Sequence, residues 1–233
     1  MIFVTGDIHA YLDISKLNSK SAFGAISKTL TRDDYLIICG DFGLVFDLQE
    51  SRTERYWLKW LEEKPYTVLW CDGNHENYNR LYSDEFPVIE FGGGKAQMIR
   101  PHIMHLLRGE TYTIDGQRFF VMGGASSHDR GEEVEDLYWW RRELPDDQEY
   151  ENALKHLEDC HYEVDYVISH CAPTSIQKRI NGNYKTDRLT CFFDEIKDRL
   201  TFKKWYFGHY HIDRDMDDQF RAIFDDVINL TDE

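Results

Sequence analysis

The chain contains a series of short apolar segments, and each of them runs directly into glycine, aspartate or histidine. These segments occupy residues 2–5, 35–39, 67–71, 119–122, 164–169 and 205–207. Nearly continuous apolar runs of this length, rich in β-branched and aromatic residues, predict strands that are buried on both faces. A sheet of such strands is stable only when further layers of structure cover it.

Helical patterns lie between several of these segments. The clearest spans residues 51–63, where aromatic and leucine side chains form one stripe and charged residues occupy the remaining face. Residues 146–160 and 191–200 are further helix candidates. The alternation of strands and helices predicts a layered α/β fold. Because no Pro/Ser-rich linker or repeat interrupts the sequence, we expect a single domain over residues 1–233.

More closely spaced strands are expected in the second half of the chain. Residues 104–107, 111–114 and 118–122 predict an antiparallel meander with a tight turn at Asp115-Gly116. Residues 219–224 and 227–230 predict two similar strands near the end of the sequence.

The charge balance and the cysteines limit the class of protein. Asp and Glu number 43 against 27 Lys and Arg, so the formal net charge is −16, which argues against a broad basic face that holds nucleic acid. The five cysteines include no C-x-x-C pair, so we expect reduced thiols in a cytoplasmic protein. No apolar run approaches the roughly 20 residues that span a bilayer, and no secretory signal pattern opens the sequence. We therefore expect no membrane partner.

Residue types that bind metals follow five of the predicted strands. They form the segments Gly6-Asp7-Ile8-His9, Gly40-Asp41, Gly73-Asn74-His75-Glu76, His170 and Gly208-His209-Tyr210-His211. Each Asp or His taken alone is most simply a turn residue or a hydrogen-bonded polar side chain. Five strand ends that all offer oxygen or nitrogen donors favour one shared site instead, because ligands of α/β sheets bind beyond the carboxyl ends of the strands.

The donor types indicate which metals fit. Carboxylate, imidazole and amide donors suit Mn, Fe, Zn, Ni or Co, and the lack of a cysteine-rich set disfavours a structural zinc site. Seven candidate ligands exceed the need of one tetrahedral ion and suit two divalent ions that share a carboxylate. Such a pair lowers the pKa of a bound water and stabilises an in-line displacement at phosphorus.

The five segments, in this order, resemble the signature of the calcineurin-like metallophosphoesterase superfamily, which reads D-x-H, G-D, G-N-H-[DE], H and G-H-x-H. They extend over residues 6–211. The resemblance implies a four-layer α/β/β/α sandwich with two mixed β-sheets and a dinuclear metal site at the carboxyl ends of the strands. It also implies two divalent metal ions, Mn²⁺ being the first expectation, and a phosphoester substrate.

The resemblance further implies two sets of ligands that share one carboxylate. The first metal would be held by Asp7, His9 and His211, the second by Asn74, His170 and His209, and both by Asp41. His75 would be the catalytic histidine near the leaving oxygen. Asp72 and Glu76 are the two candidates for orienting His75.

The sequence departs from the Ser/Thr protein phosphatase branch of the superfamily. Leu44 and Val45 stand where that branch carries an Asp that orients the histidine and an Arg that clamps phosphate. The segment Ser169-His170-Cys171-Ala172-Pro173 looks more like phosphodiesterase-type members, and the chain resembles small bacterial and phage-encoded ones. We therefore expect a phosphodiesterase acting on a nucleotide-type or short nucleic-acid substrate. The alternatives are a phosphomonoesterase, acting on a small molecule or a protein, and a non-catalytic binding scaffold on the same fold.

Residues 123–145 form the most irregular stretch of the sequence. It is long for a loop in a compact domain, and such loops are typical of functional sites. The candidate substrate contacts are Asn74, His128, Arg130 and Arg141. The alternative is that the Trp139-Trp140 pair packs this stretch onto the body while its arginines pair with nearby glutamates.

Overall fold

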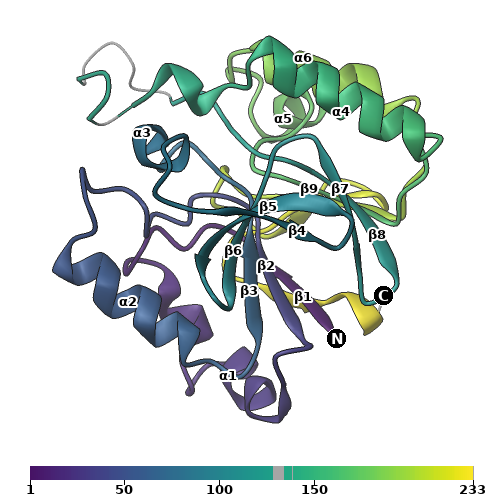
Figure 1. Ribbon diagram of the computed structural model, residues 1–233. Coiled ribbons are helices and arrows are strands. Elements are labelled where there is room, and N and C mark those ends of the chain that lie inside the picture. The colour runs from purple at the N-terminus through teal and green to yellow at the C-terminus, as the bar shows by residue number, and fades with distance from the viewer. Residues whose placement is uncertain (128–133, 138, 233) are drawn as a thin grey trace.

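The computed structural model describes residues 1–127, 134–137 and 139–232, which form four stacked layers (Figure 1). Two β-sheets face each other in the middle. The helices α1 (Ala22–Ile26) and α2 (Arg52–Glu62) cover the first sheet. The helices α4 (Asp147–Asp159), α5 (Thr174–Ile180) and α6 (Arg188–Lys197) cover the second. The predicted α/β/β/α sandwich is thus confirmed.

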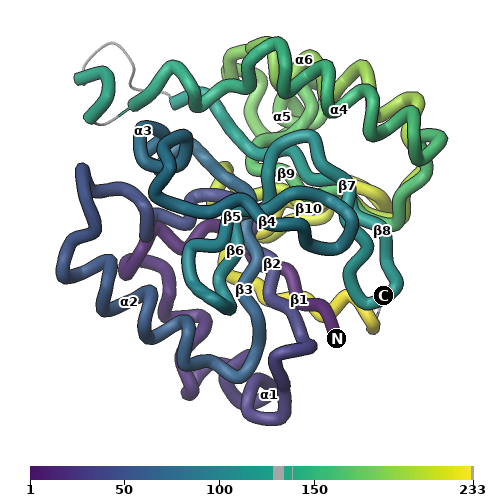
Figure 2. The backbone as a smooth tube through the Cα atoms, in the orientation of Figure 1, coloured from purple at the N-terminus to yellow at the C-terminus, as the bar shows by residue number. Residues whose placement is uncertain are grey.

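The first sheet has the strand order β13-β1-β2-β3-β6-β5-β4. Its strands are β1 (Ile2–Thr5), β2 (Tyr35–Ile38), β3 (Thr67–Trp70), β4 (Val88–Phe91), β5 (Gly94–Arg100), β6 (Ile103–Leu106) and β13 (Val227–Asn229). The four central strands are parallel, and β13, β5 and β4 pair antiparallel. Because β13 pairs with β1, the two ends of the chain lie close together (Figure 2).

The second sheet has the strand order β11-β12-β10-β9-β8-β7. Its strands are β7 (Glu110–Ile114), β8 (Gln117–Met122), β9 (Tyr166–Ser169), β10 (Lys204–Phe207), β11 (Arg214–Asp215) and β12 (Phe220–Ala222). Four of these strands are parallel, and the two edge strands β7 and β11 pair antiparallel. Both sheets are therefore mixed, as expected.

Three hydrophobic clusters separate the four layers, and alternate residues of each strand enter different clusters. In β2, Leu36 and Ile38 pack beneath the helices of the first sheet, whereas Ile37 packs between the two sheets. In β9, Val167 faces the helices of the second sheet and Ile168 faces the first sheet. This double burial explains why the strands read as continuous apolar runs.

Capping residues set the helix boundaries. The predicted helix over 51–63 is confirmed as α2, where Ser51 and Glu54 form a capping box. Helix α6 begins at Arg188 rather than at the expected Cys191. The earlier start follows from Asp187, whose carboxylate accepts a hydrogen bond from the Thr190 backbone N–H at 2.8 Å.

The expectation of an antiparallel meander is wrong. The meander breaks after its first strand, because β6 lies between β3 and β5 while β7 and β8 form a hairpin in the other sheet. His105 and Arg108, at the end of β6, bind the buried Asp72 that follows β3, and this holds β6 beside β3. The last two strands also separate, since β12 pairs with β10 and β13 with β1.

One hairpin is absent from the expectations. Strands β4 and β5 are joined by Gly92 and Gly93, whose φ angles are +58° and +90°.

None of the helices in the described ranges reaches the length and apolarity that a bilayer crossing requires.

Candidate metal centre

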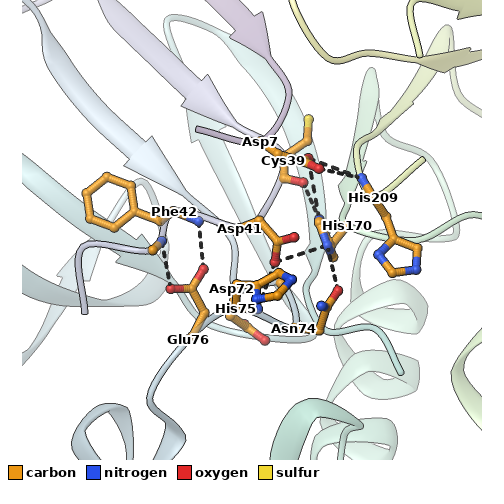
Figure 3. A network of polar contacts seen from close by, with 12 residues as sticks. Asp7, Cys39, Asp41, Phe42, Asp72, Asn74, His75, Glu76, His170 and His209 are labelled. Atoms are coloured by element: carbon orange, nitrogen blue, oxygen red, sulfur yellow. Dashed lines mark hydrogen bonds and ion pairs between the residues drawn. The ribbon is translucent and has the colours of Figure 1, made fainter. Parts of the chain in front are cut away.

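The loops that follow β1, β2, β3, β9 and β10 converge at one place between the two sheets (Figure 3). Two groups of potential ligand atoms form there, and within each group these atoms lie within 4.8 Å of one another. The first group is Asp7, His9, Asp41 and His211, and the second is Asp41, His170 and His209. The Asn74 Oδ1 atom lies 3.2 Å from His170 Nε2, beside the second group. Six of the seven candidate ligands thus form two groups that share Asp41, and the seventh, Asn74, lies beside the second group.

Asp41 lies between the two groups with one carboxylate oxygen turned to each. Its Oδ2 atom is 3.2 Å from His9 Nε2, and its Oδ1 atom is 3.2 Å from His170 Nε2. The His75 backbone N–H also donates to Oδ1 at 2.9 Å. Burial favours the neutral acid, but the charge of His170 and these hydrogen bonds hold the pKa of Asp41 well below its ordinary value. An ionised carboxylate with this placement can bridge two cations.

Two of the imidazole rings are oriented by acceptors outside the groups. His170 Nδ1 is 2.8 Å from the Cys39 carbonyl oxygen, and His9 Nδ1 is 2.8 Å from Asp13 Oδ2. A proton on each Nδ1 leaves Nε2 free as a ligand atom facing Asp41. Burial disfavours charge on His170, yet the carboxylates of Asp41 and Asp7 raise the pKa of this histidine to about 10. The negative charge of these two carboxylates also favours a bound divalent cation, so the donor set fits metal ions.

Four of the candidate ligands have left-handed backbone conformations. The φ angles are +39° for His9, +46° for Asp41, +67° for His209 and +49° for His211. Non-glycine residues reach this region at a cost of roughly 1–2 kcal/mol each. Strain of this kind concentrates at functional sites, where the surrounding fold holds it in place.

The glycines that precede two of the ligands allow close packing. A Cβ atom on Gly73 would lie 2.1 Å from Asp41 Oδ1, and one on Gly208 would lie 2.0 Å from Asp7 Oδ1. Any side chain at these positions would displace a carboxylate of the site.

Lys16 supports the backbone of the first ligand group, and the sequence analysis did not predict this role. Its buried ammonium group donates to the backbone carbonyls of Asp7 at 2.7 Å, of Gly6 at 3.3 Å, and of Phe224. Burial lowers the pKa of Lys16, and the charge of Asp7 partly offsets this effect. The Phe224 ring in turn stacks on His211 with centroids 4.8 Å apart. No spacing rule links Lys16 to the ligands, so its role appears only in three dimensions.

His75 lies at the exposed rim of the site. Its ring centroid is 5.4 Å from that of His9 and 6.5 Å from that of Phe46. Neither residue expected to orient it does so, because Glu76 accepts hydrogen bonds from the backbone of Phe42 and the next residue. Across the ranges that the structure describes, no side chain hydrogen-bonds to the His75 ring.

Asp72 belongs to a buried network behind the turn that carries Asn74 and His75. Its carboxylate accepts hydrogen bonds from Arg108 Nε at 2.8 Å and from the Tyr78 hydroxyl at 2.8 Å, and it lies 3.1 Å from His105 Nε2. Burial acts to raise the pKa of Asp72, but Arg108 and His105 outweigh it and hold this pKa below its usual value. The network therefore fixes the turn rather than the His75 ring.

Of the remaining candidates for substrate contact, the structure describes Arg141, which belongs to neither ligand group. Arg141 is exposed and pairs with Glu135 at 2.6 Å. Trp140 is buried, with its ring centroid 5.8 Å from Phe46, so it packs this stretch onto the body. His128 and Arg130 lie outside the described residues.

Two pockets adjoin the site. One, of about 350 Å³, opens beside His9 and His75. The other, of about 450 Å³, opens beside His209 and is lined by polar residues that include Ser127 and Lys185. Since each group of ligands borders a different pocket, a molecule bound at the centre can extend to either side.

Comparison with known proteins agrees with this geometry. The model of the calcineurin-like phosphoesterase family matches residues 1–213, which include every member of the two ligand groups. No curated protein matches the chain in sequence.

Proposed function

We propose that this chain, which belongs to the calcineurin-like phosphoesterase family, is a metal-dependent phosphodiesterase. Its proposed substrate is a nucleotide-type molecule or a short nucleic acid. Family membership supports a hydrolase of phosphoesters that depends on a dinuclear metal centre. The observation that carries the assignment to particular residues is the sharing of Asp41 between two ligand groups.

In this proposal each part of the site has one role. The first metal is held by Asp7, His9 and His211, the second by Asn74, His170 and His209, and both by Asp41. Two bound divalent ions, Mn²⁺ being the first choice, supply a more acidic water and offset the charge of the phosphoryl oxygens. His75 reaches the leaving oxygen from the exposed rim and gives it a proton.

Two features support a diester over a monoester. Leu44 and Val45 are completely buried, so neither can meet a phosphate, and they leave no cation where the protein phosphatase branch has its clamp. Among the described residues that line the two pockets, the only Lys or Arg is Lys185. A monoester dianion needs more positive charge than a diester monoanion, and a diester has two organic groups for two pockets.

The test compares one diester with one monoester on the purified protein. With Mn²⁺ supplied, we expect faster cleavage of bis-p-nitrophenyl phosphate than of p-nitrophenyl phosphate. Asp41→Asn should lose bound metal, measured by elemental analysis, and lose cleavage with it. Asp33→Asn, an exposed turn position, is the matched control and should keep both. Full activity and metal content in Asp41→Asn would refute the site assignment, and faster cleavage of the monoester would refute the diester preference.

A further inference from the structure

The pocket beside His75 is built by the same two loops that carry ligands of the site. One wall comes from Tyr11 and Leu12, directly after His9. The other comes from Phe46, in the loop after Asp41. A group bound in this pocket is thus held at a fixed position relative to the metal centre.

The walls of the pocket are apolar, and part of that surface faces water. Tyr11 is 55% exposed and Leu12 is 67% exposed, so two large apolar side chains stand at the mouth of this pocket. Apolar and aromatic side chains beside a few polar groups are the usual lining of a small-molecule site. Phe46 is held edge-on against the buried Trp140, with an interplanar angle of 83°, so this wall is firm.

The described walls of the pocket hold no lysine or arginine that could pair with an anionic group. Of its two acids, Glu54 is buried and already accepts hydrogen bonds from the Phe46 backbone at 2.7 Å and from Arg80 at 2.8 Å. Asp47 is exposed, so its carboxylate adds negative charge at the mouth. An anionic group would find no Lys or Arg partner in this pocket and would meet the Asp47 carboxylate at its mouth, whereas a flat neutral group could stack on Tyr11 and Phe46.

From these observations we propose that the pocket holds the leaving group of the ester, and that this group is an uncharged aromatic one, such as a nucleoside. The inference rests on the proposed function. Water supplies the oxygen that bonds to phosphorus and releases a proton to solvent. The P–O bond to the leaving alcohol breaks with its electron pair on the departing oxygen, which takes a proton from His75, and solvent then returns a proton to His75. The position of His75 on the pocket lining places that proton beside the departing oxygen. Leaving groups that carry their own phosphate or carboxylate are disfavoured.

The test uses two methyl phosphodiesters that differ by one charge. One has p-nitrophenol as the leaving group and the other has 3-carboxy-4-nitrophenol, so both release a coloured phenol. We expect kcat/KM for the carboxylated ester to be lower by about tenfold, equivalent to about 1.4 kcal/mol. Leu12→Lys, at an exposed position of the pocket, should recover most of that loss. Ile26→Lys, an exposed position on α1 outside the pocket, makes the same charge change and should recover none.

A second measurement does not depend on turnover. The two free phenols are titrated into the protein by calorimetry, and p-nitrophenol should bind more tightly to the wild type, with the preference reduced in Leu12→Lys. If neither ester is cleaved but the phenols behave as expected, the proposed function fails and the pocket assignment stands. Equal kcat/KM for the two esters, or equal binding of the two phenols, would overturn the pocket assignment.

Discussion

At the scale of single residues, the site depends on how each ligand ring is held as much as on which residue it is. His9 and His170 donate from Nδ1 to Asp13 and to the Cys39 carbonyl, so their Nε2 atoms face the shared carboxylate. His75 has no such acceptor among the residues described, and it lies at the rim instead of in the cluster. This difference separates a residue suited to proton transfer from residues suited to holding a cation.

Replacing His75 should therefore slow the reaction without emptying the site. We expect His75→Asn to lower kcat by about 10²–10⁴-fold, the usual effect of losing a general acid. Bound metal, measured by elemental analysis, should stay unchanged because the His75 ring lies in neither ligand group. A loss of metal that parallels the loss of rate would contradict this role and would make His75 a ligand.

The sequence predicted which candidate ligands lie together better than it predicted the residues that support them. Asp7, Asp41 and His170 could be found because each follows a recognisable strand. Lys16 and Arg108 could not be found, since their partners are backbone carbonyls or an aspartate more than thirty residues away. The left-handed φ angles of His9 and Asp41 also could not be predicted from the sequence, because non-glycine residues adopt them only when the surrounding fold imposes them.

At the scale of elements, β9 and β10, which candidate ligands follow, are joined to β8 at their opposite ends. Asp165 precedes β9, and its carboxylate accepts a hydrogen bond from the Arg118 backbone N–H in β8 at 2.8 Å. It also pairs with Lys203, just before β10, at 2.8 Å. One side chain thus joins the starts of three neighbouring strands of the second sheet.

This junction gives a prediction with a defined pH dependence. Burial tends to raise the pKa of Asp165, but the Arg118 N–H and Lys203 outweigh it and lower this pKa below its ordinary value. A carboxyl with a lowered folded-state pKa stabilises the fold above its unfolded pKa, about 3.9, and the contribution disappears as the pH falls through the folded pKa. Asp165→Asn should thus cost about 0.5–1.5 kcal/mol at neutral pH and progressively less below about pH 4.

Urea unfolding of the wild type and Asp165→Asn across this pH range provides the measurement. Asp218→Asn, at an exposed position, is the control and should change the unfolding free energy by less than about 0.5 kcal/mol. A destabilisation of Asp165→Asn that grows as the pH falls would contradict the predicted direction of the pH dependence.

Strand positions followed from the sequence, but several strand partners did not. The start of β1 and the ends of β8, β9 and β10 match the expected segments, because continuous apolar runs mark double burial. The position of β6 depends instead on His105 and Arg108 reaching Asp72, a long-range contact that no local pattern encodes.

At the scale of the whole molecule, a candidate cation site lies within a strongly acidic chain. Two divalent ions would add four positive charges to a chain whose formal net charge is −16. The electrostatic potential would therefore become positive only near the metal centre. Lys185 is the only described Lys or Arg on the two pockets beside the centre. A long polyanion that reaches the metals is therefore opposed by the net negative charge of the chain.

Longer anionic substrates should consequently be cleaved less efficiently, and added salt should reduce this difference. For single-stranded oligothymidylates of increasing length, we expect kcat/KM per chain end to fall with length at low ionic strength. Added salt should narrow the difference, because charges further apart than about 10 Å are screened from one another at 0.1 M ionic strength. Bis-p-nitrophenyl phosphate, with a single charge, is the control and should respond weakly to salt. The opposite pattern, in which longer strands are preferred and salt weakens that preference, is the behaviour of a basic groove that releases counterions, and it would show that a positive surface outside the described pockets binds the strand.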